Sequence, residues 1–117
     1  MAMQYKGSCH CGAVRFRADV DLSNPIVCNC SYCQRRGSML AFTPVENFEL
    51  EQGEENLTEY RFNTRQIRHL FCKTCGMESF ALGQRPDGAR MAAINVRCLE
   101  DVDPDNLQVT KVDGRSR

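Results

Sequence analysis

The sequence has no long apolar run. Nowhere in its 117 residues is there an uninterrupted apolar segment of the ~20 residues that a transmembrane helix needs. Residues 1–6, Met-Ala-Met-Gln-Tyr-Lys, do not begin the apolar stretch of a secretory signal peptide either. These two absences predict a cytoplasmic protein with no membrane partner, in a compartment where cysteines stay reduced.

An excess of charge of one sign is also absent. The chain has 15 basic and 15 acidic residues, so it lacks the net basic charge typical of nucleic-acid-binding proteins. It contains four prolines and no low-complexity stretch, and its 42% hydrophobic and 26% charged content is ordinary for a globular domain. We expect one domain over residues 1–117 and no nucleic-acid partner.

Cysteine, by contrast, occurs in tight groups. Seven of the eight cysteines fall into three clusters: Cys9-His10-Cys11, Cys28-Asn29-Cys30-Ser31-Tyr32-Cys33 and Cys72-Lys73-Thr74-Cys75-Gly76. An even cysteine count also permits disulfides, but a reducing compartment disfavours them. Thiolates two or three positions apart can converge on one ion about 2.3 Å from each sulfur. We therefore interpret the clusters as metal ligands.

The number of ligands in each cluster predicts two different metal sites. The first and third clusters together supply four thiolates, which complete a tetrahedral structural zinc site. The middle cluster supplies three, the number that a catalytic zinc uses when one coordination position stays open. The sequence therefore predicts one closed site and one open site. The alternative for the middle cluster is that Cys98 or a histidine closes it as a fourth ligand.

The apolar residues alternate with polar ones over short segments, which is typical of β-strands. Val14, Phe16, Ala18 and Val20 form one such face, and residues 77–82 and 90–96 are expected to form a hairpin around a turn at 86–88. Ser31 is the one convincing helix N-cap, for a turn of helix that Gly37 ends. The sequence predicts a mainly β, antiparallel fold with a short helical turn.

The order of these motifs resembles the glutathione-dependent formaldehyde-activating enzyme family, which includes centromere protein V-like proteins. Three segments carry the resemblance: Gly7-Ser8-Cys9-His10-Cys11-Gly12, Cys28-Asn29-Cys30-Ser31-Tyr32-Cys33 and Phe71-Cys72-Lys73-Thr74-Cys75-Gly76. They occur in the family's order and at compatible distances, over residues 5 to about 100.

The resemblance implies a small β-tent, a zinc-knuckle, β-sandwich-like fold shared with methionine sulfoxide reductase B. It implies two zinc ions per chain. The structural zinc would be held by Cys9, Cys11, Cys72 and Cys75, and the catalytic zinc by Cys28, Cys30 and Cys33. It further implies a carbon–sulfur lyase similar to S-(hydroxymethyl)glutathione synthase, with a small thiol such as glutathione and an aldehyde such as formaldehyde as partners.

The chemistry of an open three-thiolate zinc agrees with that activity. Coordination deprotonates a substrate thiol, and the thiolate can then attack an aldehyde, while breakdown of the adduct follows the same path in reverse. We expect Arg35 and Arg36 to receive the carboxylates of a glutathione-like thiol, and Tyr32 to line the pocket. The alternatives are a solvated surface for the arginines and simple packing for the tyrosine.

Three further side chains have more than one interpretation. Cys98 is expected to be a buried small hydrophobe; the alternatives place it near the open zinc or make it a redox thiol. His69 is expected to lie on a sheet face, with a catalytic base as its alternative. His10 lies between two ligands and is expected to be exposed or to contact the ligands without binding the metal, with coordination of the metal as its alternative. The competing functions are thus a zinc lyase, a zinc-stabilised binding module without catalysis, and a reductase of the methionine sulfoxide reductase B type.

Overall fold

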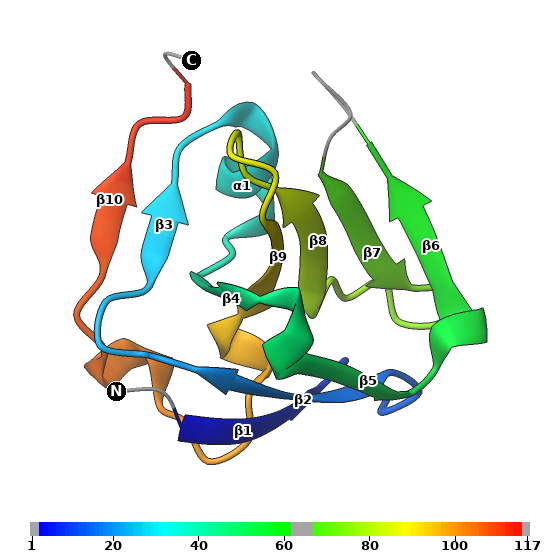
Figure 1. Cartoon of the computed structure of the whole chain (residues 1–117). Coiled ribbons are helices and arrows are strands. Elements are labelled where there is room, and N and C mark those ends of the chain that lie inside the picture. The colour runs from blue at the N-terminus through cyan, green and yellow to red at the C-terminus, as the bar shows by residue number, and fades with distance from the viewer. Residues whose placement is uncertain (1–2, 62–66, 116–117) are drawn as a thin grey trace.

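The computed structural model describes residues 3–61 and 67–115, which form two β-sheets and one short α-helix (Figure 1). The strands are β1 (Met3–Ser8), β2 (Arg15–Val20), β3 (Ile26–Cys28), β4 (Leu40–Pro44), β5 (Phe48–Gln52), β6 (Leu57–Tyr60), β7 (Arg68–Cys72), β8 (Phe80–Gln84), β9 (Arg90–Asn95) and β10 (Thr110–Val112). The α-helix is α1 (Ser31–Arg36), and the 3₁₀ helices are η1 (Val45–Asn47), η2 (Glu54–Asn56), η3 (Val96–Cys98) and η4 (Pro104–Asn106). None of the helices described is both long and apolar enough to cross a membrane.

The strands are divided unequally between the two sheets. One sheet has the order β1-β2-β5, and the other has the order β10-β3-β4-β9-β8-β7-β6. In Figure 1 the smaller sheet lies along the bottom, and the larger one rises from it with the β10–β3 and β7–β6 pairs as its two wings. The structure confirms the expected mainly β fold with a short helical turn. Its sheets are antiparallel except for β10, which pairs with β3 in parallel.

The elements predicted from local patterns are present. In β2 and the residue before it, Val14, Phe16, Ala18 and Val20 are each at most 1% exposed. Strands β8 and β9 form the expected hairpin, although β8 begins at Phe80 because the residues before it form a loop. Helix α1 ends at Gly37 (φ 72°) as expected. Its N-cap, however, is Cys30 and not Ser31, because the Cys30 sulfur accepts the hydrogen bond from the Cys33 backbone N–H.

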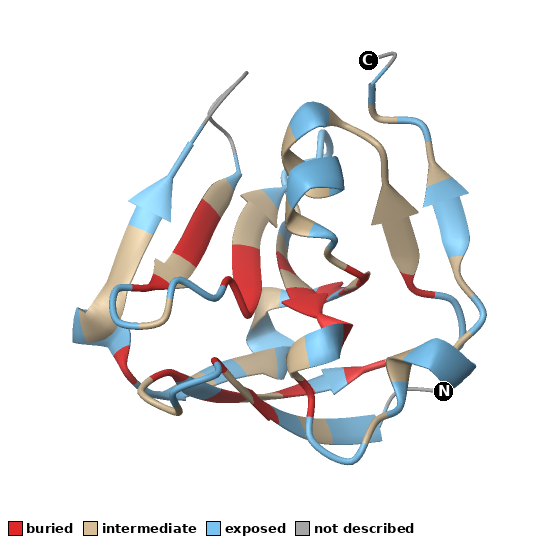
Figure 2. Cartoon of the chain, turned by 180° about the vertical axis from the view of Figure 1, so that it is seen from behind, coloured by how far each residue is buried: buried red, intermediate tan, exposed pale blue. Residues whose placement is uncertain are grey.

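The main core lies between the two sheets. Phe16 of β2, Phe48 of β5 and Phe80 of β8 contact one another there, with ring centroids 4.7 to 5.9 Å apart. Figure 2 shows the buried residues concentrated where the sheets meet, whereas the edge strands β6 and β10 carry no buried residue. Because strand side chains alternate, the larger sheet has a second face, on the side away from this core.

Candidate functional site

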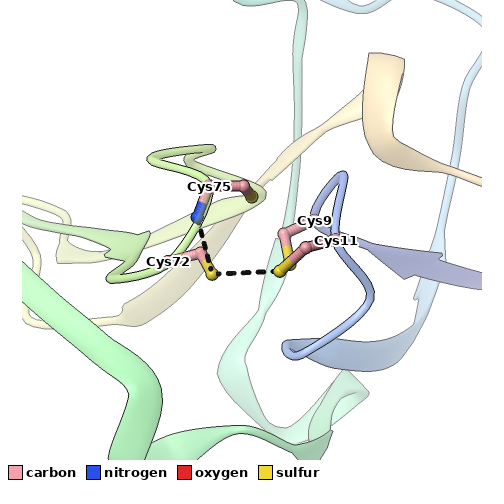
Figure 3. A group of neighbouring side chains, drawn as sticks. All are labelled: Cys9, Cys11, Cys72 and Cys75. Carbon is pink, nitrogen blue, oxygen red and sulfur yellow. Dashed lines mark hydrogen bonds between the residues drawn. The ribbon is translucent and has the colours of Figure 1, made fainter.

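Four cysteines converge from two loops that are distant in the sequence. Cys9 and Cys11 lie in the loop between β1 and β2, and Cys72 ends β7 with Cys75 in the turn that follows. Their sulfur atoms all lie within 4.8 Å of one another, and Figure 3 shows the two loops facing each other across them. We call these residues the four-cysteine set.

The spacing of these sulfurs fits a tetrahedral metal site. The Cys11 Sγ lies 3.6 Å from the Cys9 Sγ and 3.6 Å from the Cys72 Sγ. A zinc ion about 2.3 Å from each sulfur requires tetrahedral edges of roughly 3.8 Å, whereas a disulfide requires about 2.05 Å. All eight cysteines lie within the described residues, and none of them is in a disulfide bond. The four-cysteine set could therefore hold a metal ion.

Backbone N–H groups point at the sulfurs of this set. Thr74 N and Cys75 N lie 3.4 and 3.5 Å from the Cys72 Sγ, and the Asn56 side-chain amide lies 3.3 Å from it. Burial opposes ionisation of Cys72, but the backbone N–H groups of Cys75 and Thr74, together with hydrogen bonds from the Cys11 and Cys9 thiols, lower its pKa to about 6. The glycine after each pair has a positive φ, 84° at Gly12 and 78° at Gly76, a conformation that glycine adopts without steric cost.

The middle cluster forms a second set of sulfurs. Cys28 ends β3, Cys30 caps α1, and Cys33 lies in the first turn of that helix. The three sulfurs lie within 4.8 Å of one another, and among the described residues no fourth cysteine, histidine or carboxylate joins them. The N–H groups of Cys30 and Cys33 donate to the Cys28 and Cys30 sulfurs, each at 3.4 Å. This three-cysteine set could also hold a metal ion.

The C-terminal segment covers one side of the three-cysteine set. Asn29 N donates to the Val112 carbonyl at 3.1 Å, and Arg115 N donates to the Asn29 side-chain oxygen at 2.9 Å. These bonds bring Gly114 so close that an added Cβ would lie 2.5 Å from the Cys28 Sγ. The chain approaches the cysteine here at a distance that only glycine permits.

A cavity of about 570 Å³ opens beside the three-cysteine set. The three cysteines line it, together with Tyr32, His69 and Glu78. The remaining lining residues are Ile26, Ser38, Leu40, Phe42, Ile67, Ala81, Leu82, Gly83, Gln84, Arg85, Met91, Ala93 and Val112. A possible metal site and a cavity of ligand size thus share one wall.

Glu78 is the centre of a buried polar network in this wall. One of its carboxylate oxygens accepts from the Tyr32 hydroxyl and lies 3.3 Å from the Arg36 Nε, and the other lies 2.9 Å from the His69 Nδ1. His69 and Tyr32 are also in ring contact, with centroids 4.3 Å apart. Burial and the hydrogen bond to Glu78 raise the Tyr32 pKa to about 12, so its hydroxyl remains a donor at neutral pH. The carboxylate orients His69 with Nδ1 toward Glu78.

The structure separates the residues predicted to bind substrate. Tyr32 lines the cavity, as expected, but Arg35 and Arg36 do not. The two arginines border a shallower hollow on the outside, together with Tyr32, Tyr60 and Phe71. The Arg35 Nη1 donates to the Ser31 carbonyl at 2.9 Å, so part of the guanidinium is bound within its own helix. A role of either arginine in binding carboxylates stays a prediction.

The remaining predicted side chains lie outside the three-cysteine set. Cys98 is in η3, is partly buried, and belongs to neither cysteine set. Burial raises the pKa of its thiol to about 11. His10 is exposed, as expected. His69 is 7% exposed and lines the cavity; Ile67, two positions earlier and 48% exposed, lines the same cavity.

Sequence reasoning missed Glu78 and the C-terminal segment. Glu78 is the one carboxylate in residues 77–82, an otherwise uncharged stretch. A single charge in such a stretch could have marked Glu78 as a candidate site residue. The contact between Glu78 and His69, however, depends on the path of the loop after Cys75, which the sequence pattern does not give. The segment from Thr110 to Arg115 has no comparable signal, because a three-residue strand is too short for a periodic pattern.

Comparison with known proteins agrees with the motifs. The family model described as glutathione-dependent formaldehyde-activating enzyme matches residues 4–111. The chain is also similar to a Rhodobacter sphaeroides protein of known crystal structure, with 36% identity and a TM-score of 0.79; the match covers 90% of this chain and 99% of that one. The match to the family model extends over most of the 117 residues. The chain belongs to the glutathione-dependent formaldehyde-activating enzyme family.

Proposed function

We propose that this chain is a zinc-dependent carbon–sulfur lyase that forms and breaks adducts between a small thiol and an aldehyde. The observation that carries the proposal is the three-cysteine set in the wall of a cavity that also holds His69 and Glu78. The four-cysteine set is not among the described residues that line this cavity and is assigned a structural zinc. The family supports glutathione as the thiol and formaldehyde as the aldehyde.

The three-cysteine set suits an open metal site. Cys28, Cys30 and Cys33 provide three sulfur ligands, and a fourth position can face the cavity. Zinc bound there would supply a strong preference for the deprotonated form of a substrate thiol. The chain's own contribution is to keep these sulfurs in place, through α1 on one side and the C-terminal segment on the other.

His69 is assigned the proton transfer. With Nδ1–H donated to Glu78, its Nε2 is the basic nitrogen. When the adduct forms, His69 takes the proton of the thiol, the sulfur adds to the carbonyl carbon, and the imidazolium returns the proton to the new alkoxide oxygen. In the reverse direction Nε2 takes the hydroxyl proton, the carbon–sulfur bond breaks, and the proton goes to the departing sulfur. Nothing is oxidised or reduced.

Glu78 and Arg36 support this role electrostatically. Their side chains are 8% and 27% exposed and lie 3.3 Å apart, so the arginine balances the carboxylate charge. Glu78 can then stabilise the imidazolium while the proton resides on His69. Arg35 is assigned the contact with a substrate carboxylate, because its guanidinium is the more exposed of the two.

The test is exchange NMR on glutathione and formaldehyde with zinc-loaded protein. We expect the wild type to accelerate interconversion between glutathione and its hydroxymethyl adduct, and Cys30→Ser to abolish that acceleration. His69→Gln should reduce it by about 100-fold or more at unchanged metal content, as for loss of a general acid–base. Cys98→Ser is the control and should keep the wild-type rate. Equal rates with the wild type and Cys30→Ser would contradict the proposal.

A further inference from the structure

The cavity beside the three-cysteine set is lined mainly by hydrocarbon. Strands β3, β4, β8, β9 and β10 each contribute to its wall. In β9, Ala92 and Ile94 belong to the core between the sheets, and the alternate residues Met91 and Ala93 line the cavity. A sheet face in contact with water would carry polar residues at such alternate positions. Both faces of this part of the sheet are apolar.

The same pattern extends to the mouth of the cavity. In β4, Ala41 and Thr43 are 4% exposed, while Phe42 between them is 48% exposed and lines the cavity. Ile67 on the opposite wing is also 48% exposed and lines it. Large apolar side chains that gather at the rim of a concave site indicate contact with an apolar ligand.

The charged side chains that line the cavity already form ion pairs within the protein. Apart from the cysteines, the charged side chains that line the cavity are Glu78, paired with Arg36, and Arg85, paired with Asp87 at 2.9 Å. Glutathione carries two carboxylates and an ammonium group, whereas the charged side chains of this wall are already paired with other residues of the chain. Formaldehyde has two heavy atoms and would leave most of about 570 Å³ unfilled. Neither compound accounts for the apolar wall.

We infer that the natural substrate carries an apolar hydrocarbon chain, on the thiol or on the aldehyde, and that this chain fills the cavity. The inference rests on the proposed function for the position of the reacting sulfur at the three-cysteine set. Contact between an apolar chain and the cavity wall is inferred only from the residues that line the cavity. The substrate class is therefore an alkyl- or aryl-substituted thiol or aldehyde.

The test uses NMR of the Ala93 methyl group in zinc-loaded protein, a signal that does not require a metal–thiol bond. One series consists of ethanethiol, butanethiol and hexanethiol, and a second of the glutathione adducts of formaldehyde, butanal and hexanal. Affinity should rise about fourfold for each methylene that enters the cavity. A rise in the first series assigns the chain to the thiol, and a rise confined to the second assigns it to the aldehyde. A polar thiol of similar size, 3-mercaptopropane-1,2-diol, should bind at least about tenfold more weakly than butanethiol.

Substitutions of residues that line the cavity test whether the dependence of affinity on chain length arises there. Phe42→Ala and Met91→Ala should each weaken binding of the longest ligand by about fivefold and leave ethanethiol unaffected. Met3→Ala is the matched control, because Met3 is 60% exposed in β1 and does not line the cavity. Affinity independent of chain length in both series would overturn the inference, even if every thiol bound. Failure of the proposed function would instead leave the absorption spectrum of cobalt-substituted protein insensitive to thiols, while the methyl shifts of the zinc-loaded protein still followed chain length.

Discussion

The Arg36 Nη1 donates a hydrogen bond to the carbonyl oxygen of Gly76 at 3.2 Å. Arg36 is on α1, the helix that carries Cys33, and Gly76 ends the turn that carries Cys75. The same guanidinium lies 3.3 Å from Glu78. One side chain thus joins the helix of the three-cysteine set, the loop of the four-cysteine set and the carboxylate that orients His69.

Arg36 and Arg35 should therefore differ in their effect on stability. Arg36→Ala leaves Glu78 buried without its cation and removes the contact with Gly76, so we expect a loss of about 2 kcal/mol in the free energy of unfolding. Arg35→Ala, on the exposed side of the same helix, should cost no more than about 0.5 kcal/mol. Urea unfolding of the zinc-loaded variants measures both. Equal costs would show that the Arg36 contacts contribute nothing beyond an exposed arginine.

The two cysteine sets should respond differently to loss of a ligand. Cys72→Ser removes a buried ligand of the four-cysteine set, where we expect a structural zinc to contribute on the order of 10 kcal/mol, so the protein should unfold or precipitate. Cys30→Ser should lose one zinc and remain folded. Metal analysis and far-ultraviolet circular dichroism distinguish the two. Unfolding of both variants to the same extent would remove the basis for calling one site structural.

Gly114 should be required for metal binding at the three-cysteine set. In Gly114→Ala the new Cβ would meet the Cys28 Sγ at 2.5 Å, so the sulfur or the C-terminal segment must move, at a cost of about 1 to 3 kcal/mol. After dialysis against a chelator we expect about one zinc per chain instead of two. Gly83→Ala is the control, since its Cβ would lie at an ordinary 3.5 Å from Ile67. Retention of both metals by Gly114→Ala would refute the proposed constraint.

Cys98 should behave as a protected, protonated thiol. Burial raises its pKa from 9.0 to about 11, so little thiolate is present at pH 7. In zinc-loaded protein, alkylation of Cys98 by iodoacetamide should be slow and should rise about tenfold per pH unit beyond pH 9, where an ordinary thiol levels off. Cys98→Ala should cost around 1 kcal/mol and keep the zinc content. Fast alkylation at neutral pH would instead favour the reductase hypothesis.

The cysteine clusters were predictable because the spacing that identifies each of them lies within a few consecutive residues. The spacing within Cys72–Cys75 already requires a tight turn, and the glycine that follows permits the positive φ observed at Gly76. Pairing of the first cluster with the third followed from the number of ligands that zinc needs. The alternation over residues 14–20 likewise predicted one buried face of β2, because strand side chains have a period of two.

The cavity and its polar network depend on relations that no local pattern contains. Glu78 reaches Tyr32 across 46 positions of sequence, and Asn29 reaches Arg115 across 86. The cavity exists because the two wings of the larger sheet face each other, which depends on the order of all seven strands. Arg35 and Arg36 lie only two and three positions after Cys33, yet they border a different hollow from the cavity that Cys33 lines.

The central claim is that the three-cysteine set holds a metal with an open position that accepts a thiol. The most direct measurement is the visible and near-ultraviolet absorption of cobalt-substituted protein, shown by metal analysis to carry two ions, during titration with glutathione and with butanethiol. We predict that at least one of these thiols changes the sulfur-to-cobalt absorption, and that Cys30→Ser with one cobalt shows no such change. A cobalt spectrum unchanged by every thiol in the doubly loaded protein would contradict the claim and leave a zinc-stabilised binding module as the better description.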